Sequence, residues 1–506
     1  MRIVPPLTLL LVALALSLVP PARAAEDAAP DAVDEPVRFE TSAEGRFGGE
    51  RVRYRVEAGE MHLTDADGAP TAALFSVAYV AEGADRDADE TRPVTFVWNG
   101  GPGSASLWLH MGLLGPKRVR VASAADADDG APPYRLEDNP VTILDLTDLV
   151  FVDPIGTGYS RVVGAGKTEA YWGQQGDTDS MAQFIRRWVT EHDRWNAPRW
   201  IIGESFGTTR AAAVADTLMG GGQDMALSGI VMISQAMDYT GSTPSRDNLI
   251  AYVTYLPTLA ATAWYHGRAG AGLSLEEVVE RARAFATETY LPALFRGSTL
   301  PENERRAVAA TLSELLGLDV DHVLRADLRV TVARFTKELL RDQGLAVGRL
   351  DGRYTADDPD DTGDSPRLGD AASNAITSAY TAALNAWHAD LGIRMDRPYL
   401  TSNRDVGRNW DYSEGPGSSG GEPAYVNTAR HLSNALRKNG DLRVLVANGY
   451  YDLVTPFFDA EYTVARHEIL ADRIDMRYYA AGHMMYVRDE DFDALLGDIR
   501  SFYAGD

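Results

Sequence analysis

Near the middle of the chain runs the stretch Trp200-Ile201-Ile202-Gly203-Glu204-Ser205-Phe206-Gly207-Thr208-Thr209. A short apolar segment ends in Gly-x-Ser-x-Gly, and the alanine-rich segment 211–218 follows it. This order predicts a strand, a sharp turn and a helix, with a serine hydroxyl presented at the tip of the strand. The pattern is short, so it indicates a catalytic serine only if an oxyanion donor lies upstream and an acid and a histidine lie downstream.

The first residues have the pattern of an export signal. Residues 9–19 are apolar but too few to span a bilayer, and Ala22-Arg23-Ala24 forms a small-x-small cleavage site. We therefore expect a signal peptide over 1–24 and a flexible, acidic leader over 25–36. The alternative is an uncleaved anchor helix, which Pro20-Pro21 disfavours because it ends the apolar run early.

The composition excludes several classes of site and partner. The chain has 506 residues, of which 45% are hydrophobic, enough for one large core and an inserted domain. It has no cysteine, which excludes a cysteine nucleophile and cysteine-bound zinc. A formal charge of −25 argues against nucleic acid and anionic membranes as partners, so we expect neither after signal cleavage. The oligomeric state is not predicted.

Short apolar segments alternate with helical patterns over most of the chain. Residues 37–97 favour strands in antiparallel hairpins, because apolar and polar residues alternate there. The buried strands expected after them lie at 93–98, 148–153, 227–234 and 442–447, with a last strand at 476–479. Helical patterns at 179–195 and 489–503 interleave with these strands. Such alternation predicts a mostly parallel sheet.

The pattern changes after about Asp238. Amphipathic segments, with no buried strand between them, are expected as helices at 275–290, 304–316 and 327–341, the last with Asp327 as a possible N-cap. A further helix, expected at 371–391, returns to the main body. We therefore predict a core in two parts, 37–238 and 391–506, with a helical cap inserted over 239–390.

A serine nucleophile needs a base in contact with it and a carboxylate that orients the base. In folds with this turn the chain order is serine, acid, histidine. His483 follows the last expected strand in a loop of small residues, and Asp452 follows the strand at 443–447. The other downstream histidines at 322, 388, 431 and 467 lie in helical patterns, and His266 is ambiguous.

The oxyanion of an acyl-transfer reaction needs backbone N–H donors. The residue after the nucleophile, Phe206, supplies one. The second is expected from Asn99-Gly100-Gly101-Pro102-Gly103 at the end of an upstream strand, with Gly101 as the donor. A phosphate-binding loop is the alternative, but the Lys-Ser/Thr pair of a P-loop is missing.

Together these stretches resemble the serine carboxypeptidase family. The matching segments occur in the family's order: Asn99-Gly100-Gly101-Pro102-Gly103-Ser104, Asp153-Pro154-Ile155-Gly156-Thr157-Gly158-Tyr159-Ser160, Gly203-Glu204-Ser205-Phe206-Gly207, Asn448-Gly449-Tyr450-Tyr451-Asp452 and Gly482-His483-Met484. The resemblance implies an α/β-hydrolase fold, with a mostly parallel central sheet, helices on both faces and a helical cap. It also implies an exopeptidase that removes residues from the C-terminus of a peptide, without a metal or cofactor.

The resemblance also assigns roles to single residues. It implies a catalytic triad of Ser205, Asp452 and His483. It implies an oxyanion hole formed by Gly101 and Phe206. It also implies that Asn99 and Glu204 form the pair that binds the substrate's terminal carboxylate. Two departures, Ser104 in place of a cysteine and Val97 in place of a tryptophan, leave the side-chain preference open. An esterase or acyltransferase on the same scaffold, and a binding protein without catalysis, are the alternatives.

The expected position of Glu204 bears on pH dependence. This side chain would face a substrate carboxylate, and two like charges there repel, so a proton must be shared. A protonated Glu204 donates a hydrogen bond, whereas an ionised one cannot. We therefore expect peptide hydrolysis to be favoured at acidic pH, while ester or amide-blocked substrates tolerate higher pH.

Overall fold

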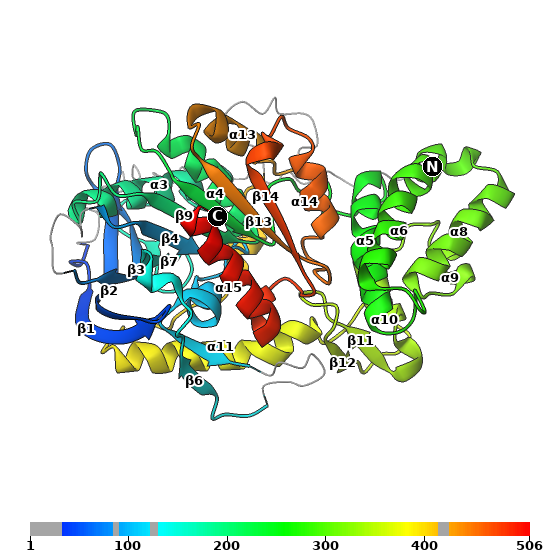
Figure 1. The fold of residues 1–506 in the computed structure, drawn as a ribbon, viewed down its shortest axis with the longest axis horizontal. Coiled ribbons are helices and arrows are strands. Elements are labelled where there is room, and N and C mark those ends of the chain that lie inside the picture. The colour runs from blue at the N-terminus through cyan, green and yellow to red at the C-terminus, as the bar shows by residue number, and fades with distance from the viewer. Residues whose placement is uncertain (1–32, 84–90, 122–129, 413–424, 506) are drawn as a thin grey trace, which may run out of the picture.

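The computed structural model describes residues 33–83, 91–121, 130–412 and 425–505. The expected signal peptide, 1–24, lies outside the described residues, as does most of the expected leader. Figure 1 shows a large body built on a twisted sheet and a smaller helical lobe beside it. In the described ranges, no helix combines the length and the apolar character needed to cross a bilayer.

A ten-stranded sheet forms the centre of the body. Its order is β1 (Arg38–Phe47), β2 (Glu50–Thr64), β3 (Pro70–Ala81), β7 (Asp148–Val152), β4 (Val94–Trp98), β9 (Arg199–Glu204), β10 (Gly229–Ile233), β13 (Arg443–Gly449) and β14 (Ile474–Tyr479), with β8 (Arg161–Val162) paired to β3. Strands β1 to β3 are antiparallel, and β3 also pairs antiparallel with β7. From β7 to β14 every pairing is parallel. The predicted hairpins and mostly parallel sheet are confirmed.

Both faces of the sheet are buried, which explains the continuous apolar runs of its central strands. In β9, Trp200 and Ile202 belong to one buried cluster and Ile201 to the other. The cluster around Trp200 packs on α11 (Ala371–Asp390), α15 (Asp489–Ala504) and the segment 107–114. The cluster around Ile201 packs on α3 (Gln174–Glu191), α4 (Phe206–Leu218) and α13 (Ala429–Lys438). Helices therefore cover both faces, as predicted.

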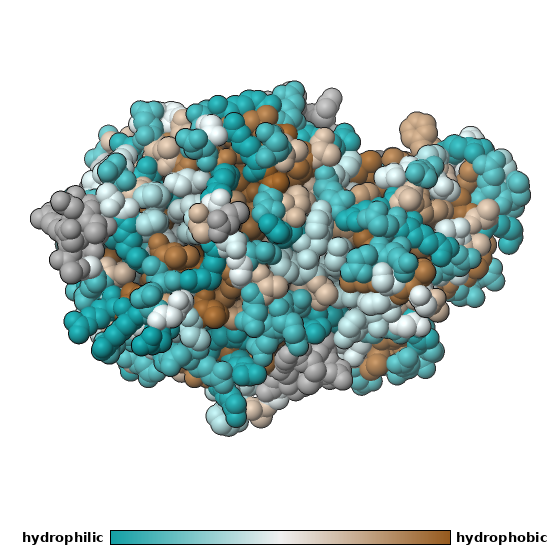
Figure 2. All heavy atoms as spheres, viewed as in Figure 1, coloured by the Kyte–Doolittle hydropathy of each residue, from teal (hydrophilic) through white to brown (hydrophobic). Residues whose placement is uncertain are grey.

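The helical lobe has a buried cluster of its own. It is built from α5 (Leu249–Tyr265), α6 (Leu275–Phe285), α7 (Leu291–Arg296), α8 (Glu302–Leu316), α9 (Val320–Arg325) and α10 (Val332–Glu338). Figure 2 shows the outline of the molecule narrowing between this lobe and the body, and hydrophilic residues over most of the visible face. Figure 1 places α5 next to α14 (Phe457–Val464), at the β14 end of the sheet. The boundaries at 239 and 390 remain a prediction.

One expectation for this region was wrong. Asp327 is not an N-cap: the last helix of the lobe begins at Val332, and the Thr331 side chain accepts a hydrogen bond from the Arg334 N–H. Asp327 itself has φ 54°, outside helical geometry. A hairpin of β11 (Leu345–Val347) and β12 (Thr355–Asp357), where the sequence pattern predicted no element, follows the helices of the lobe and precedes α11. Its strands have three residues each, too few to show an alternating pattern. The loop between them reaches the candidate site.

Candidate active site

Ser205 stands at the turn between β9 and α4. Its backbone has φ 59° and ψ −130°, a conformation that costs a residue with a side chain free energy of about 1–3 kcal/mol. A Cβ atom on Gly203 would lie 2.4 Å from the carbonyl oxygen of Gly207, so strand and helix meet where only hydrogen fits. The predicted strand, sharp turn and helix are therefore present, and the serine is only partly buried.

The glycine loop after β4 lies directly on this turn. A Cβ atom on Gly100 would lie 2.4 Å from the backbone nitrogen of Phe206 and 2.8 Å from that of Gly207. Gly101 has φ 110° and is exposed, whereas Phe206 is buried. The loop and the residue after Ser205, about a hundred positions apart in the chain, thus adjoin at the tip of neighbouring strands β4 and β9.

Asp452 and His483 contact each other through their side chains. Nδ1 of His483 lies 2.8 Å from Oδ2 of Asp452, and both residues are buried. Burial alone would lower the pKa of His483, but the Asp452 carboxylate outweighs it and the pKa is raised above its usual value. Asp452 therefore orients the imidazole through Nδ1 and stabilises its charged form. A histidine that acts as a general base requires both effects.

The structure brings this pair to the same sheet edge as Ser205. Asp452 and His483 follow β13 and β14, which extend the parallel sheet beyond β9 and β10. Burial raises the pKa of Glu204, the neighbour of Ser205 in the chain, and the charge of His483 opposes that rise, so His483 lies near Glu204. Within the described ranges, neither the Ser205 hydroxyl nor Nε2 of His483 has a hydrogen-bond partner. Such contacts are often open in enzymes without substrate.

Asn99 and Glu204 form a second buried pair beside the serine. The Asn99 side-chain amide donates to Oε1 of Glu204 at 2.9 Å, and its oxygen accepts from the backbone N–H of Leu109 at 3.0 Å. Burial raises the pKa of Glu204 to about 7. This carboxyl therefore holds or releases a proton near neutral pH, as the sequence argument for Glu204 requires.

Arg210 supports this pair from inside the body. Its Nη1 donates to the backbone carbonyl of Asn99 at 2.9 Å, and its Nε donates to Asp177 at 2.7 Å. Arg210 is fully buried, so the ion pair with Asp177 compensates its charge. Its position, one turn into the helix after Ser205, was the only sign of this role in the sequence.

Two hydroxyl side chains that the sequence reasoning missed hold the acid and the histidine. Thr455 donates to Oδ2 of Asp452 at 2.6 Å and lies 3.2 Å from Nδ1 of His483. Ser234, at the end of β10, donates to the backbone carbonyl of His483 at 2.7 Å. No motif marks either residue, since each acts through contacts that only the fold creates.

The loop between β11 and β12 contacts the two segments that carry Asp452 and His483. The backbone carbonyl of Leu350 accepts from the His483 N–H at 2.6 Å, and that of Arg349 accepts from the Leu453 N–H at 3.1 Å. Arg353 pairs with Asp351 and donates to the carbonyl of Ala480 at 2.6 Å. A segment of the predicted cap therefore braces the loops that carry the acid and the histidine.

The remaining downstream histidines lie elsewhere. His388 is buried in α11 among aromatic rings, and burial lowers its pKa to about 4. His322 and His431 lie in α9 and α13, as predicted, while His266 ends α5 and contacts the carbonyl of Gly352 at 2.8 Å. His467 was wrongly expected in a helix: it has φ 55° and follows the end of α14.

Comparison with known proteins gives one family match and several similar solved structures. Residues 60–266 match the family model described as serine carboxypeptidase, a range that contains the glycine loop and Ser205 but ends before Asp452. The fold is similar to that of Kex1Δp, a prohormone-processing carboxypeptidase from Saccharomyces cerevisiae. The two share 15% identity and a TM-score of 0.53, covering 89% of this chain and 91% of that one. A putative aryl esterase from Burkholderia cenocepacia has 12% identity and a TM-score of 0.32, covering 88% and 97%.

Proposed function

We propose that this chain, a serine carboxypeptidase-like hydrolase of the α/β-hydrolase fold, releases C-terminal residues from peptides through an acyl-enzyme on Ser205. The observation that carries the proposal is the pairing of two constellations at one sheet edge. One is the hydrogen-bonded pair Asp452–His483, beside a strained serine turn. The other is the buried pair Asn99–Glu204, which suits a carboxylate ligand.

In the proposed mechanism, Ser205 attacks the scissile carbonyl while His483 takes its proton. The negative charge that develops on the carbonyl oxygen is stabilised by the backbone N–H groups of Gly101 and Phe206. His483 then returns the proton to the leaving amine, so the C–N bond breaks and the acyl group stays on Ser205. Water, activated by the same histidine, hydrolyses this ester and restores the serine. Asp452 stabilises the imidazolium at both steps.

Glu204 gives the proposal a pH dependence. In this proposal the substrate's terminal carboxylate binds to Asn99 and to a protonated Glu204, because the negative charge of an ionised Glu204 would repel it. The pKa of Glu204 is about 7, so this carboxyl loses its proton as the pH rises through neutrality. Peptide kcat/KM should therefore fall as pH rises through this pKa, while an ester with a blocked carboxyl terminus should not show that fall. In Glu204→Gln the fall should vanish.

The proposal includes export of the mature chain. Support comes from the positive start, the apolar run 9–19 and the cleavage pattern at 22–24. The experiment that checks it is N-terminal sequencing of the protein recovered from the periplasm and from the medium. A mature end near Ala25 is the expected result, and an intact Met1 on a cell-retained protein contradicts it.

The reaction class is tested by mass spectrometry of a peptide mixture after incubation with the enzyme. Ladders shortened stepwise from the C-terminus support the proposal, and Ser205→Ala should produce none. Internal cleavage would contradict it, as would hydrolysis confined to esters. Transfer of the acyl group to an added amine or alcohol, in preference to water, would instead indicate an acyltransferase.

A further inference from the structure

Two buried polar atoms beside Ser205 have no hydrogen-bond partner among the described residues. One is Oε2 of Glu204, whose other oxygen accepts from Asn99. The second is the hydroxyl of Tyr486, three residues after His483. A buried polar atom without a partner costs free energy, so such atoms are uncommon and call for an explanation. The mechanism above uses the proton of Glu204 but gives the Tyr486 hydroxyl no role.

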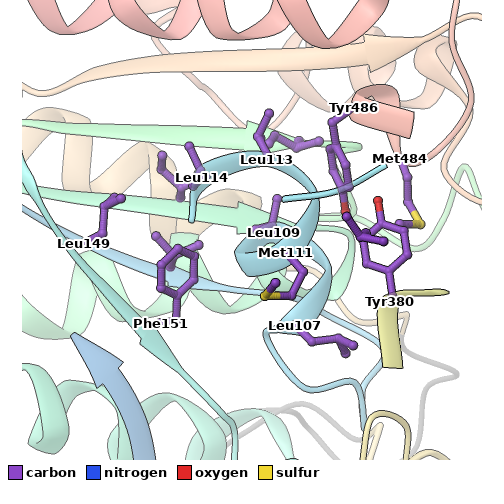
Figure 3. Close-up of a cluster of buried hydrophobic side chains, with 14 of the residues drawn as sticks. Leu107, Leu109, Met111, Leu113, Leu114, Leu149, Phe151, Tyr380, Met484 and Tyr486 are labelled. Carbon is purple, nitrogen blue, oxygen red and sulfur yellow. The ribbon is translucent and has the colours of Figure 1, made fainter. Parts of the chain in front are cut away.

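These two atoms belong to one cluster. Burial is the largest cause of the raised pKa of both groups; beyond burial, the Tyr486 hydroxyl lowers the pKa of Glu204 and the Glu204 carboxylate raises that of Tyr486. The phenol therefore lies near the carboxyl, although in the described part of the chain neither Oε2 nor the hydroxyl has a partner within hydrogen-bond geometry. Figure 3 shows Tyr486 and Tyr380 with their hydroxyl oxygens turned toward each other. A Cβ atom on Gly112 would lie 2.6 Å from Tyr380 Oη and from Tyr486 Cε2, so the two rings meet over this glycine.

The groups that face Glu204 come from four elements. His483 and Asp452 lie on the loops after β14 and β13, Asn99 lies on the loop after β4, and Tyr486 lies in the short 3-10 helix Met485–Val487. Burial raises the pKa of Glu204 most, and Asp452 adds to that rise. His483 and Tyr486 act in the opposite direction, as does Asn99. Tyr486 is therefore one of three groups that favour the ionised carboxyl.

We propose that Tyr486 is a positioning residue whose hydroxyl donates a hydrogen bond to Oε2 of Glu204 when this carboxyl ionises, and so sets the pH range in which substrates with a free carboxylate are accepted. The inference rests on the proposed function, because it assumes that Glu204 receives such substrates. A hydrogen bond to a charged oxygen is stronger than one to a neutral carboxyl, so the phenol stabilises the ionised form more. Without it, burial would keep Glu204 protonated to higher pH.

The test is the pH profile of kcat/KM for Tyr486→Phe, measured on a free-carboxylate peptide and on the matching peptide ester with a blocked carboxyl terminus. Removal of the donor should move the alkaline limb of the peptide profile upward by about one pH unit. The ester profile should stay in place. Site-specific 3-fluorotyrosine at position 486 is a more acidic donor of nearly the same shape, and it should move the peptide limb downward.

Controls separate this role from a structural one. Tyr290→Phe removes another buried phenol oxygen, which donates to the Leu328 carbonyl in the lobe, and should leave both profiles unchanged. In the Glu204→Gln background, Tyr486→Phe should shift nothing further. Unchanged limbs in both Tyr486 variants would overturn the inference, as would equal shifts on peptide and ester. If the unaltered enzyme showed no preference for the free carboxylate, the proposed function would fail first, and the inference with it.

Discussion

The glycine loop 99–103 and the turn 203–207 form one half of the candidate site, here called the nucleophile half. Asp452, Thr455 and His483, braced by residues 349–353, form the acid–base half. In the nucleophile half, backbone meets backbone at distances that leave no room for a side chain. In the acid–base half, side-chain hydrogen bonds of 2.6 to 2.8 Å set the geometry.

This difference predicts which kind of substitution should disrupt the geometry of each half. The close backbone contact is disrupted by adding an atom, because the strand ends cannot move apart without disrupting the packing of the buried side chains on both faces of the sheet. A hydrogen-bonded group is broken by removing an atom, because a buried donor or acceptor is then left unpaired. The two halves also differ in support: the nucleophile half rests on the sheet body, whereas the acid–base half also contacts the predicted cap.

The largest effect is expected from Asp452→Asn. The amide cannot stabilise an imidazolium, and it can turn its NH₂ toward Nδ1 and favour the wrong tautomer of His483. We expect kcat to fall about 10⁴-fold with the fold intact, measured by burst and steady-state kinetics alongside thermal unfolding. Asp459→Asn is the matched control. Burial raises the pKa of Asp459 well above its usual value, and this carboxyl lies in α14, outside the candidate site, so kcat should stay within roughly twofold.

A loss of activity below tenfold in Asp452→Asn would contradict the assigned role. Another carboxylate would then have to orient the histidine. Glu204 is the other carboxylate whose charge raises the pKa of His483, and a larger loss in Glu204→Gln would reveal that it takes this role.

A smaller effect is expected from Gly100→Ala, which disrupts the nucleophile half by adding a Cβ atom. Its Cβ atom would lie 2.4 Å from the Phe206 nitrogen, so the loop must move by about 1 Å, and a misplacement of this size costs on the order of 100-fold in rate. Gly497→Ala in α15 is the control, since nothing lies within 4 Å of the added atom. Fluorophosphonate labelling of Ser205 measures the loss directly. Equal labelling of both variants would show that the loop tolerates the displacement.

These two halves also differ in how far the sequence predicted them. The nucleophile half could be predicted from the sequence because its constraints are local. Gly203 and Gly207 flank one serine, and Gly100 and Gly101 follow one buried strand. The alternation of strands and helices predicted a mostly parallel sheet, so the edge on which Asp452 and His483 meet could be inferred, although the order of the strands could not. The parallel pairing from β7 to β14 bears this out.

Much of the acid–base half was not predictable in the same way. Thr455 and Ser234 look like ordinary turn residues, and their roles come from contacts with His483, which lies 28 and 249 positions away from them in the chain. The brace at 349–353 lies between strands too short to leave a periodic pattern. Tyr486 is one apolar residue among several until burial brings its hydroxyl to Glu204. Long-range proximity, not residue type, carries these roles.

The smallest effect is expected from Thr455→Val, a change of nearly constant volume. Asp452 keeps its two backbone donors, Val454 and Thr455, at 2.8 and 2.9 Å, and loses only the hydroxyl at 2.6 Å. One lost hydrogen bond should lower kcat about fivefold. Because the carboxylate then shares its charge with fewer donors, it holds the His483 proton more strongly. The acid limb of the ester profile should move to higher pH, and an ester keeps Glu204 out of the measurement.

Thr463→Val separates this effect from the cost of altering any buried threonine. Thr463 lies in α14, fully buried, and its hydroxyl has no partner among the described residues, so its loss removes no hydrogen bond. It should leave both kcat and the acid limb in place. If Thr455→Val lowered kcat without moving the limb, the hydroxyl would only hold Asp452 in position. If neither changed, the two backbone donors would suffice, and the acid–base half would be as rigid as the nucleophile half.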